Sequence, residues 1–188
     1  MARNKEFNPD EALDRAVQAF WRHGYGGTTM QMLVDATGVV RASLYATFGN
    51  KAEIFALALE RYGQMQAARL AGVPREQMLE RWFEAAIEDA EREDVPGGCL
   101  LVTAAGDFAV LPAELQGLVQ QHLERLRVFF RFCVQRPDEP PDSDELSALI
   151  DALHAANIGI YVLSRCRAPS QQLLRVARSA LDMVERRD

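Results

Sequence analysis

The sequence predicts an all-α fold of about nine helices, and three observations support it. Apolar residues recur at three- and four-residue intervals along nearly the whole chain, the spacing of one helix face. No segment alternates convincingly between apolar and polar residues, as a half-buried strand would. Short segments containing glycine or proline separate the periodic stretches. At 188 residues, the chain is long enough to bury a core without disulfides or metals.

The first helix is expected to begin at Asn8 and to end at Gly24. Asn8 is a favourable N-cap, Pro9 suits the first helical turn, and Glu11 stands at the spacing of a capping box. The pair Gly26-Gly27 then breaks the chain. The apolar stripe behind the cap consists of Leu13, Ala16, Val17, Phe20 and Trp21.

Two short helices follow, joined by a tight turn. The first of them begins near Thr28 or Thr29, either of which can cap it. It ends at Gly38, because glycine readily adopts the left-handed backbone of a helix stop. The second runs from about Val40 to Thr47.

Further helices fill the rest of the chain. Breaks are expected at 72–74, at 95–98 and at Leu111-Pro112, and the proline-rich segment 137–143 is the clearest linker. The expected helices start after Lys51 and after Pro74, span Cys99 to Phe108, follow Pro112, and run from Asp144 to about Cys166 and from Ser170 to about Arg187.

Composition and charge exclude several classes of protein. Residues 1–51 hold six basic against five acidic residues, so the total net charge of −6 leaves −7 on residues 52–188. Affinity for nucleic acid must therefore be local. Three widely spaced cysteines suit neither a disulfide framework nor a zinc cluster. Without an apolar run typical of a signal peptide or membrane span, we expect a cytoplasmic protein with no membrane partner.

The two short helices have the dimensions of a helix-turn-helix. In that motif the second helix enters the major groove while the first lies across the DNA backbone. Hydroxyl, amide and ammonium groups can bind phosphates, and arginine, serine, threonine and alanine suit base edges. The alternative is that both are core helices of a bundle. The candidate phosphate contacts are Thr28, Thr29, Tyr45 and Lys51, and the candidate base contacts are Arg41, Ala42, Ser43 and Thr47.

These residues resemble the N-terminal domain of the TetR family of bacterial transcriptional repressors. The resemblance covers roughly residues 8–62 with several fixed spacings, and the remaining chain matches the family's layout, which closes in two long helices. The matching residues are Gly24-Tyr25, Thr28-Thr29, Gly38-Val39, Ser43-Leu44-Tyr45, Phe48, Lys51 and Phe55.

The resemblance implies two domains and a mechanism. Residues 1–51 would form a three-helix DNA-binding domain with the helix-turn-helix, and 52–188 a helical ligand-binding and dimerisation domain. Such proteins are homodimers that bind a near-palindromic operator, that is, double-stranded DNA, and are released by a small molecule. This chain departs from the family pattern at Val40, where a capping serine is usual, and at Val34, where a smaller alanine is common.

The last two helices are candidates for the dimer interface. The segment from Glu145 to Cys166 has almost no polar face, and a helix apolar on all sides must be buried on both. A core on one side and a second subunit on the other would satisfy this requirement. Ala155, Ala156 and Gly159 would permit close approach. The alternative is that both helices are internal to a monomer.

Candidate residues for a small-molecule site come from the middle helices. Apolar walls with a few polar groups are typical of such a site, but also of an ordinary core, so both interpretations stay open. The two histidines in the set lack the pattern of a metal site. The candidates are Met65, Met78, Trp82, Phe83, Phe108, His122, Phe129, Phe130, His154 and Tyr161.

Cys99 is a candidate thiol sensor. It stands at the expected start of a helix, where amide groups and the helix dipole would lower a thiol pKa. The segment 98–102 also resembles one branch of the family, in which such a cysteine senses electrophiles or oxidants. The alternative is that Cys99 is a small buried hydrophobe.

No catalytic pattern was found in the sequence, so we expect neither an enzyme nor a bound cofactor or metal. The glycine pairs lack the context of a phosphate-binding loop. The favoured interpretation is a ligand-released repressor. The alternatives are a DNA-binding regulator without a small-molecule inducer and a helical small-molecule-binding protein that does not bind DNA.

Overall fold

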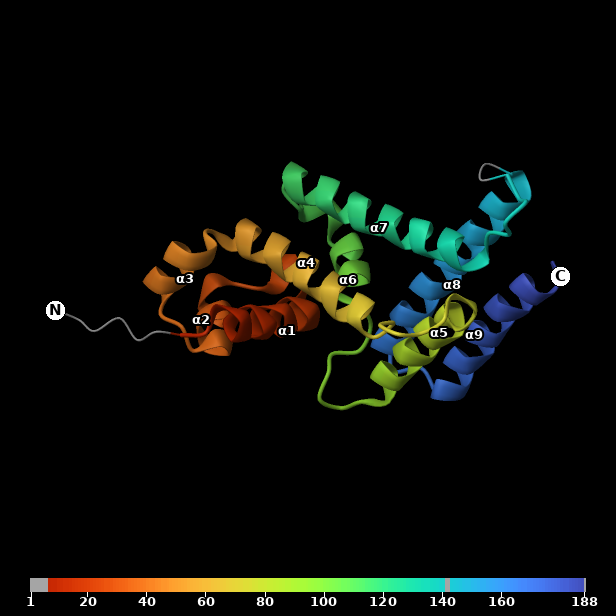
Figure 1. Ribbon diagram of the computed structural model, residues 1–188. Helices are drawn as coiled ribbons and strands as arrows, with labels where there is room; N and C mark the ends of the chain where they lie inside the picture. The colour runs from red at the N-terminus through yellow and green to blue at the C-terminus, as the bar shows by residue number, and fades with distance from the viewer. Residues whose placement is uncertain (1–6, 141–142, 188) are drawn as a thin grey trace.

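The computed structural model describes residues 7–140 and 143–187, and within these ranges the regular structure is entirely helical (Figure 1). This confirms the predicted fold class and the number of α-helices. The helices are α1 (Pro9–Gly27), α2 (Met30–Thr37), α3 (Arg41–Phe48), α4 (Lys51–Ala68), α5 (Arg75–Glu91), α6 (Leu100–Gly106), the 3-10 turn η1 (Phe108–Val110), α7 (Ala113–Val134), α8 (Asp144–Arg165) and α9 (Ser170–Glu185).

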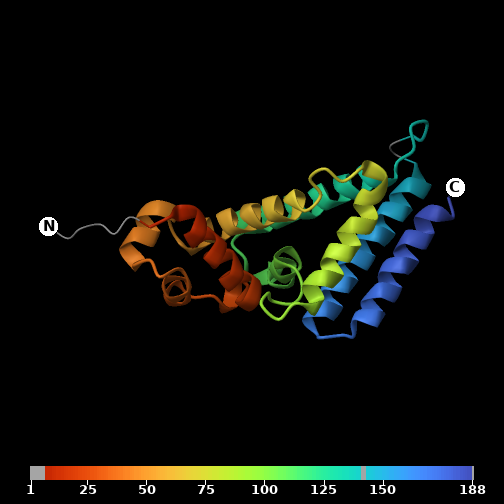
Figure 2. The same cartoon turned by 60° about the horizontal axis from the view of Figure 1, so that its bottom comes forward.

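The molecule is elongated, with α1, α2 and α3 at one end and α5, α8 and α9 at the other (Figures 1 and 2). Helices α5, α8 and α9 lie side by side and contact one another. Helix α4 packs on α1 at one end of the molecule and on α7 further along, and α6 lies between the two ends. The long helices α4 and α7 therefore connect the two groups.

Helix α1 continues beyond its predicted end at Gly24. Its N-terminus is as expected, since the Asn8 side chain accepts hydrogen bonds from the amides of Asp10 and Glu11. Gly24 has φ +72, which kinks the helix, and one further turn then reaches Gly27. The kink is held by Asp107, whose carboxylate accepts from the Gly26 amide at 3.1 Å. Gly26-Gly27 therefore completes the helix instead of breaking it.

The turn between α2 and α3 follows the sequence prediction closely. Thr29 is the N-cap of α2, and its hydroxyl oxygen accepts from the Met32 amide at 3.1 Å. Gly38 ends the helix with φ +72, the left-handed conformation expected there. Val40 is the N-cap of α3 and makes no side-chain capping bond, as its apolar side chain requires.

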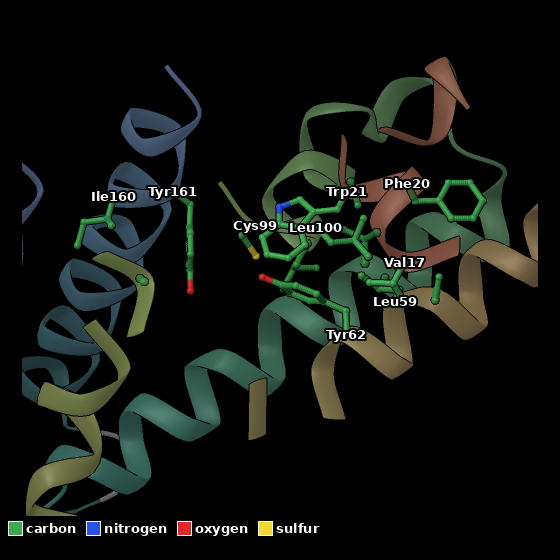
Figure 3. Close-up of a cluster of buried hydrophobic side chains, with 14 of the residues drawn as sticks. Val17, Phe20, Trp21, Leu59, Tyr62, Cys99, Leu100, Ile160 and Tyr161 are labelled. Carbon is green, nitrogen blue, oxygen red and sulfur yellow. The ribbon is translucent and has the colours of Figure 1, made fainter. Parts of the chain in front are cut away.

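Aromatic side chains join α4 to α1. The Phe20 and Phe55 rings meet edge to face with centroids 5.0 Å apart, and those of Trp21 and Tyr62 do so at 5.1 Å. Figure 3 shows Trp21 and Tyr62 beside Leu100 of α6, at the junction of the two ends of the molecule. The predicted domain boundary after residue 51 falls in the first turn of α4, and α4 packs both on α1 at one end of the molecule and on α7 further along.

Two helices of the C-terminal part differ in detail from the prediction. The expected helix from Cys99 to Phe108 is the shorter α6, followed by the separate turn η1. Helix α8 is long and apolar enough, by length and composition, to span a membrane. However, it packs against α5, α7 and α9, and its buried residues include Leu146, Ile150 and Leu153, as in the core helix of a globular domain.

Candidate DNA-binding surface and ligand pocket

Helix α3 presents an exposed face anchored by one buried residue. Leu44 is buried, whereas Arg41, Ala42 and Thr47 are exposed. Tyr45 is 45% exposed although it is a large aromatic residue. Ser43, the remaining candidate on this helix, is half-buried. The candidate base contacts therefore lie on one short helix, with their side chains available to a partner.

Thr28 is not available for the phosphate contact predicted from the sequence. Its side chain is fully buried, and its hydroxyl donates to the Gly24 carbonyl at 2.6 Å. Because the kink at Gly24 leaves that carbonyl without its helical partner, Thr28 serves as the C-cap of α1. The neighbouring Thr29 is exposed and caps α2, so of the two threonines only Thr29 presents its side chain to solvent.

Lys51 is the first residue of α4, and its ammonium group lies 4.3 Å from the centre of the Tyr25 ring. This cation–π contact positions the lysine next to the helix-turn-helix. Partial burial lowers the pKa of Lys51 and raises that of Tyr25. On the other side, the Arg15 guanidinium donates to the Thr37 carbonyl at 3.1 Å and fixes the end of α2 on α1.

A cavity of about 520 Å³ lies among α4, α5, α7 and α8. Its size is typical of sites for small organic molecules. Half of the ten candidates from the sequence line it, namely Met78, Trp82, His122, Phe129 and Tyr161.

The other five candidates lie elsewhere in the structure. Phe83 and Phe130 are core residues, with ring centroids 6.5 Å apart. His154 packs beside Phe130, Met65 is exposed on α4, and Phe108 belongs to η1. They were predicted because core and cavity-lining residues have the same composition and periodicity.

Sequence reasoning missed the contribution of α4 to the cavity. Leu59, Tyr62, Gly63 and Gln66 of α4 line it, together with Leu126 of α7. Their spacing of three and four residues was a usable signal, because it continues the apolar face of α4 past its contact with α1.

The polar groups around the cavity are mostly paired. The Trp82 indole N–H donates to Asn157 Oδ1 at 2.8 Å. At the cavity wall, Glu60 Oε2 accepts from Arg125 at 2.8 Å and lies 3.4 Å from His122 Nε2. The hydrogen bond from Arg125 lowers the pKa of Glu60, whereas burial lowers the pKa of His122. The negative charge of Glu60 and the positive charge of Arg125 therefore balance each other.

The predicted activation of Cys99 by the helix terminus is wrong. Cys99 is the N-cap of α6, as expected, but it is only 6% exposed. Burial raises the pKa of its thiol, since desolvation of the thiolate outweighs the hydrogen bonds with Tyr62 and with the amides of Val102 and Leu101. The sulfur lies between Tyr62 and Tyr161 at the cavity wall (Figure 3).

A second cavity of about 300 Å³ adjoins the kink of α1. It shares Cys99 and Tyr161 with the first cavity, and Gly24, Asp107 and Arg165 also line it. The lining of the first cavity is therefore continuous with residues that contact the end of the molecule formed by α1, α2 and α3. Among the described residues, no three His, Cys, Asp or Glu side chains form a group able to hold a metal ion.

Family models match both ends of the chain. Residues 12–58 match the model described as bacterial regulatory proteins of the tetR family, and residues 72–181 match the tetracyclin repressor-like C-terminal domain. The first match contains the helix-turn-helix, and the second contains α5 to α8 and most of α9.

Individual relatives and solved structures agree with these matches. The transcriptional repressor ComR of Escherichia coli is 29% identical over 95% of this chain and 90% of its own length. The regulator YezE of Bacillus subtilis is 26% identical over 92% and 94%.

Among solved structures, a cysteine mutant of the TetR-family regulator CifR, complexed with double-strand operator DNA, superposes with a TM-score of 0.79 at 28% identity. The superposition covers 96% of this chain and 98% of CifR. The C-terminal model alone covers more than half of the chain. The chain therefore belongs to the TetR family of bacterial transcriptional regulators, as the sequence predicted.

Proposed function

We propose that this protein is a cytoplasmic repressor that binds a near-palindromic operator as a homodimer and is released from it by a small molecule. The observation that carries the proposal is the exposed face of α3, where Arg41, Ala42 and Tyr45 are free of intramolecular packing on their outer side. A relative of similar length, ComR, is named a repressor, and CifR was solved on operator DNA.

Operator binding rests on a few placed contacts. Arg41 is suited to guanine, and Ala42 to the methyl group of thymine, if α3 lies in the major groove. Thr29, Tyr45 and Lys51 would bind phosphates on either side. Because the rest of the chain is acidic, nonspecific attraction to DNA should be weak, and the salt dependence of binding should reflect a handful of phosphates per subunit.

Dimerisation through α8 and α9 is supported by what these helices leave exposed. Along α8, Ala148, Ala155 and Val162 form an exposed stripe at helical spacing, with Val162 47% exposed. On α9, Leu174 is 37% exposed. Small residues on α8 allow another helix to approach closely, and burial of the apolar side chains would stabilise the contact.

Release by a ligand is supported by the location of the 520 Å³ cavity. Helix α4, which also packs on α1, forms part of the cavity wall. A ligand there would therefore touch the helix that joins the two ends of the molecule. A ligand that binds better to one arrangement of α4 would shift the population toward that arrangement. Electrophile sensing by Cys99 is a second candidate role, favoured by its place in the cavity wall but opposed by its raised pKa.

Two measurements test the proposed function. The operator is first selected from random double-stranded DNA, and light scattering then gives the mass of the free protein and of its complex. We expect a dimer in both, and inverted half-sites one or more helical turns apart. A monomer bound to a single, non-repeated site would contradict the proposal. A regulator without an inducer would bind the operator equally well but ignore every cavity ligand.

A further inference from the structure

The chemistry of the 520 Å³ cavity restricts the ligands it can take. Aromatic rings from four helices face it, with Trp82 of α5 and Phe129 of α7 in contact at a centroid distance of 5.0 Å. Tyr62 of α4 and Tyr161 of α8 add two further rings. Flat aromatic molecules pack well against such walls, because offset and edge-to-face contacts add to the burial of apolar surface.

Among the described residues that line the cavity, no uncompensated charge is available to balance a charged ligand. Glu60 and Arg125, which line it, bind each other at 2.8 Å, and burial lowers the pKa of His122, so that its neutral form is favoured. The buried Asp89 is neutralised by Arg69 through two hydrogen bonds of 2.6 Å. Transfer of an ionised ligand from water would therefore be penalised without compensation.

Two buried polar groups of the described residues at the cavity are poorly satisfied, and the first is the hydroxyl of Tyr62. The hydroxyl of Tyr62 has no nitrogen or oxygen partner within the described chain, although Tyr62 is only 3% exposed. Its only hydrogen bond there is with the Cys99 thiol, and thiols are weak partners. In Figure 3 the hydroxyl points away from α4 toward the space in front of Tyr161. A buried hydroxyl whose one partner is a weak thiol costs free energy, part of which a ligand oxygen would recover.

His122 provides a second polar group next to the same helix. Its Nε2 atom is buried and has no partner closer than Glu60 at 3.4 Å. The ring packs against Gly63, the residue directly after Tyr62, where an added Cβ would lie 3.5 Å from Cε1. The two unsatisfied groups therefore come from facing positions on α4 and α7.

We propose that the cavity binds a neutral aromatic compound carrying a hydroxyl or carbonyl oxygen, with Tyr62 donating its hydrogen bond to that oxygen. The inference rests on the ligand-release part of the proposed function and names the chemical class of the ligand. Tyr62 is the residue that selects for the oxygen, and the compensated charges select against ions.

Three probes with the same ring system test this inference: para-phenylphenol, biphenyl and para-phenylbenzoate. Binding to the free protein, without DNA, is followed by quenching of tryptophan fluorescence, since Trp82 lies in the wall. We expect para-phenylphenol to bind at least about tenfold more tightly than biphenyl, equivalent to ~1.4 kcal/mol, and the benzoate to bind most weakly. Equal or tighter binding of biphenyl or the benzoate, or no binding by any probe, would overturn the inference.

The variant Tyr62→Phe removes the hydroxyl while keeping the ring. It should lower the affinity for para-phenylphenol by about tenfold and leave the affinity for biphenyl unchanged, which also shows that the cavity is intact. Tyr25→Phe is the matched control, because Tyr25 packs on Phe55 outside the cavity, and it should change neither affinity. An unchanged phenol affinity in Tyr62→Phe would refute the role of this hydroxyl.

Release from DNA is measured separately, by adding para-phenylphenol to the operator complex. Binding that depends on Tyr62 without release would contradict ligand-released repression and leave the assigned ligand class intact. Release by a charged effector that does not depend on Tyr62 would overturn the ligand class and support the repressor.

Discussion

The guanidinium of Arg165, in the last turn of α8, donates to the Trp21 carbonyl of α1 at 3.0 Å. It also donates to the Arg22 carbonyl and to Thr103 Oγ1, each at 3.1 Å. Because α1 is kinked directly after these residues, its last regular carbonyls are partly free of helical partners and can accept the arginine. One side chain of the C-terminal part thus binds α6 and the DNA-binding end together.

The first prediction concerns this arginine. Arg165→Met should lower the free energy of unfolding by about 1 kcal/mol, because hydrogen bonds from a charged donor to two carbonyls are lost at a solvent-exposed site. For a chain of this length the melting temperature should fall by roughly 2–4 °C. The comparison is made by calorimetry at one protein concentration.

Arg186→Met, at the C-cap of α9, is the matched control and should melt like the unchanged protein. An Arg165 variant as stable as this control would show that the bridge adds nothing to stability.

The second prediction concerns the kink of α1. Gly24→Ala should destabilise the protein by about 1–3 kcal/mol, because φ is +72 there and an added Cβ would lie 2.5 Å from an Asp107 carboxylate oxygen. Gly117→Ala is the opposite case, since Gly117 is inside α7 and an added Cβ meets nothing within 4 Å. It should stabilise by about 0.4–1 kcal/mol. Urea midpoints of the two variants that shift in the same direction would contradict this account.

The third prediction concerns the start of α3. Val40→Ser should stabilise the protein by about 1 kcal/mol, since a serine at this N-cap can accept from the free amide of Ala42 or from that of Ser43. Val40 is 65% exposed, so loss of its apolar contacts costs little. Val40→Ala removes the same side chain without adding a cap. If urea denaturation gives the serine and alanine variants the same midpoint, a capping side chain at this position does not stabilise the protein.

The fourth prediction concerns pH. Burial lowers the pKa values of His122 and His154 below the ordinary value of 6.5 in the folded protein. Below about pH 6.5 the unfolded chain therefore binds protons that the folded chain does not, and stability decreases as the pH falls toward the folded-state pKa values. Urea midpoints at pH 7 and pH 5 measure this loss. It should be smaller in the double variant His122→Gln, His154→Gln, and an unchanged loss would assign it to other groups.

The helix-turn-helix could be predicted from the sequence because short-range chemistry determines it. Gly38 must adopt a positive φ, Thr29 can cap α2, and a helix as short as α3 buries only Leu44. The burial of Thr28 could not be predicted, because Thr28 and Thr29 are equally good caps. The choice between them depends on the kink at Gly24. That kink is held by the hydrogen bond from Gly26 to Asp107, 81 residues further along the chain.

The cavity was only half predicted, for a different reason. Trp82 and Phe83 are adjacent aromatic residues of α5, yet one lines the cavity and the other is core. Periodicity identifies the buried side of a helix but does not show where two buried sides fail to meet. The raised pKa of Cys99 follows from the same cause, since helix position was visible in the sequence and the depth of burial was not.

The central claim is that α3 reads operator DNA, and a mobility-shift assay with the selected operator tests it most directly. The double variant Arg41→Ala, Tyr45→Ala removes two exposed side chains and leaves the buried anchor Leu44 in place. We expect operator affinity to fall by at least about thirtyfold, because one base contact and one phosphate contact are lost at ~1–3 kcal/mol each. The melting temperature should stay unchanged. Full operator affinity in this variant would contradict the claim.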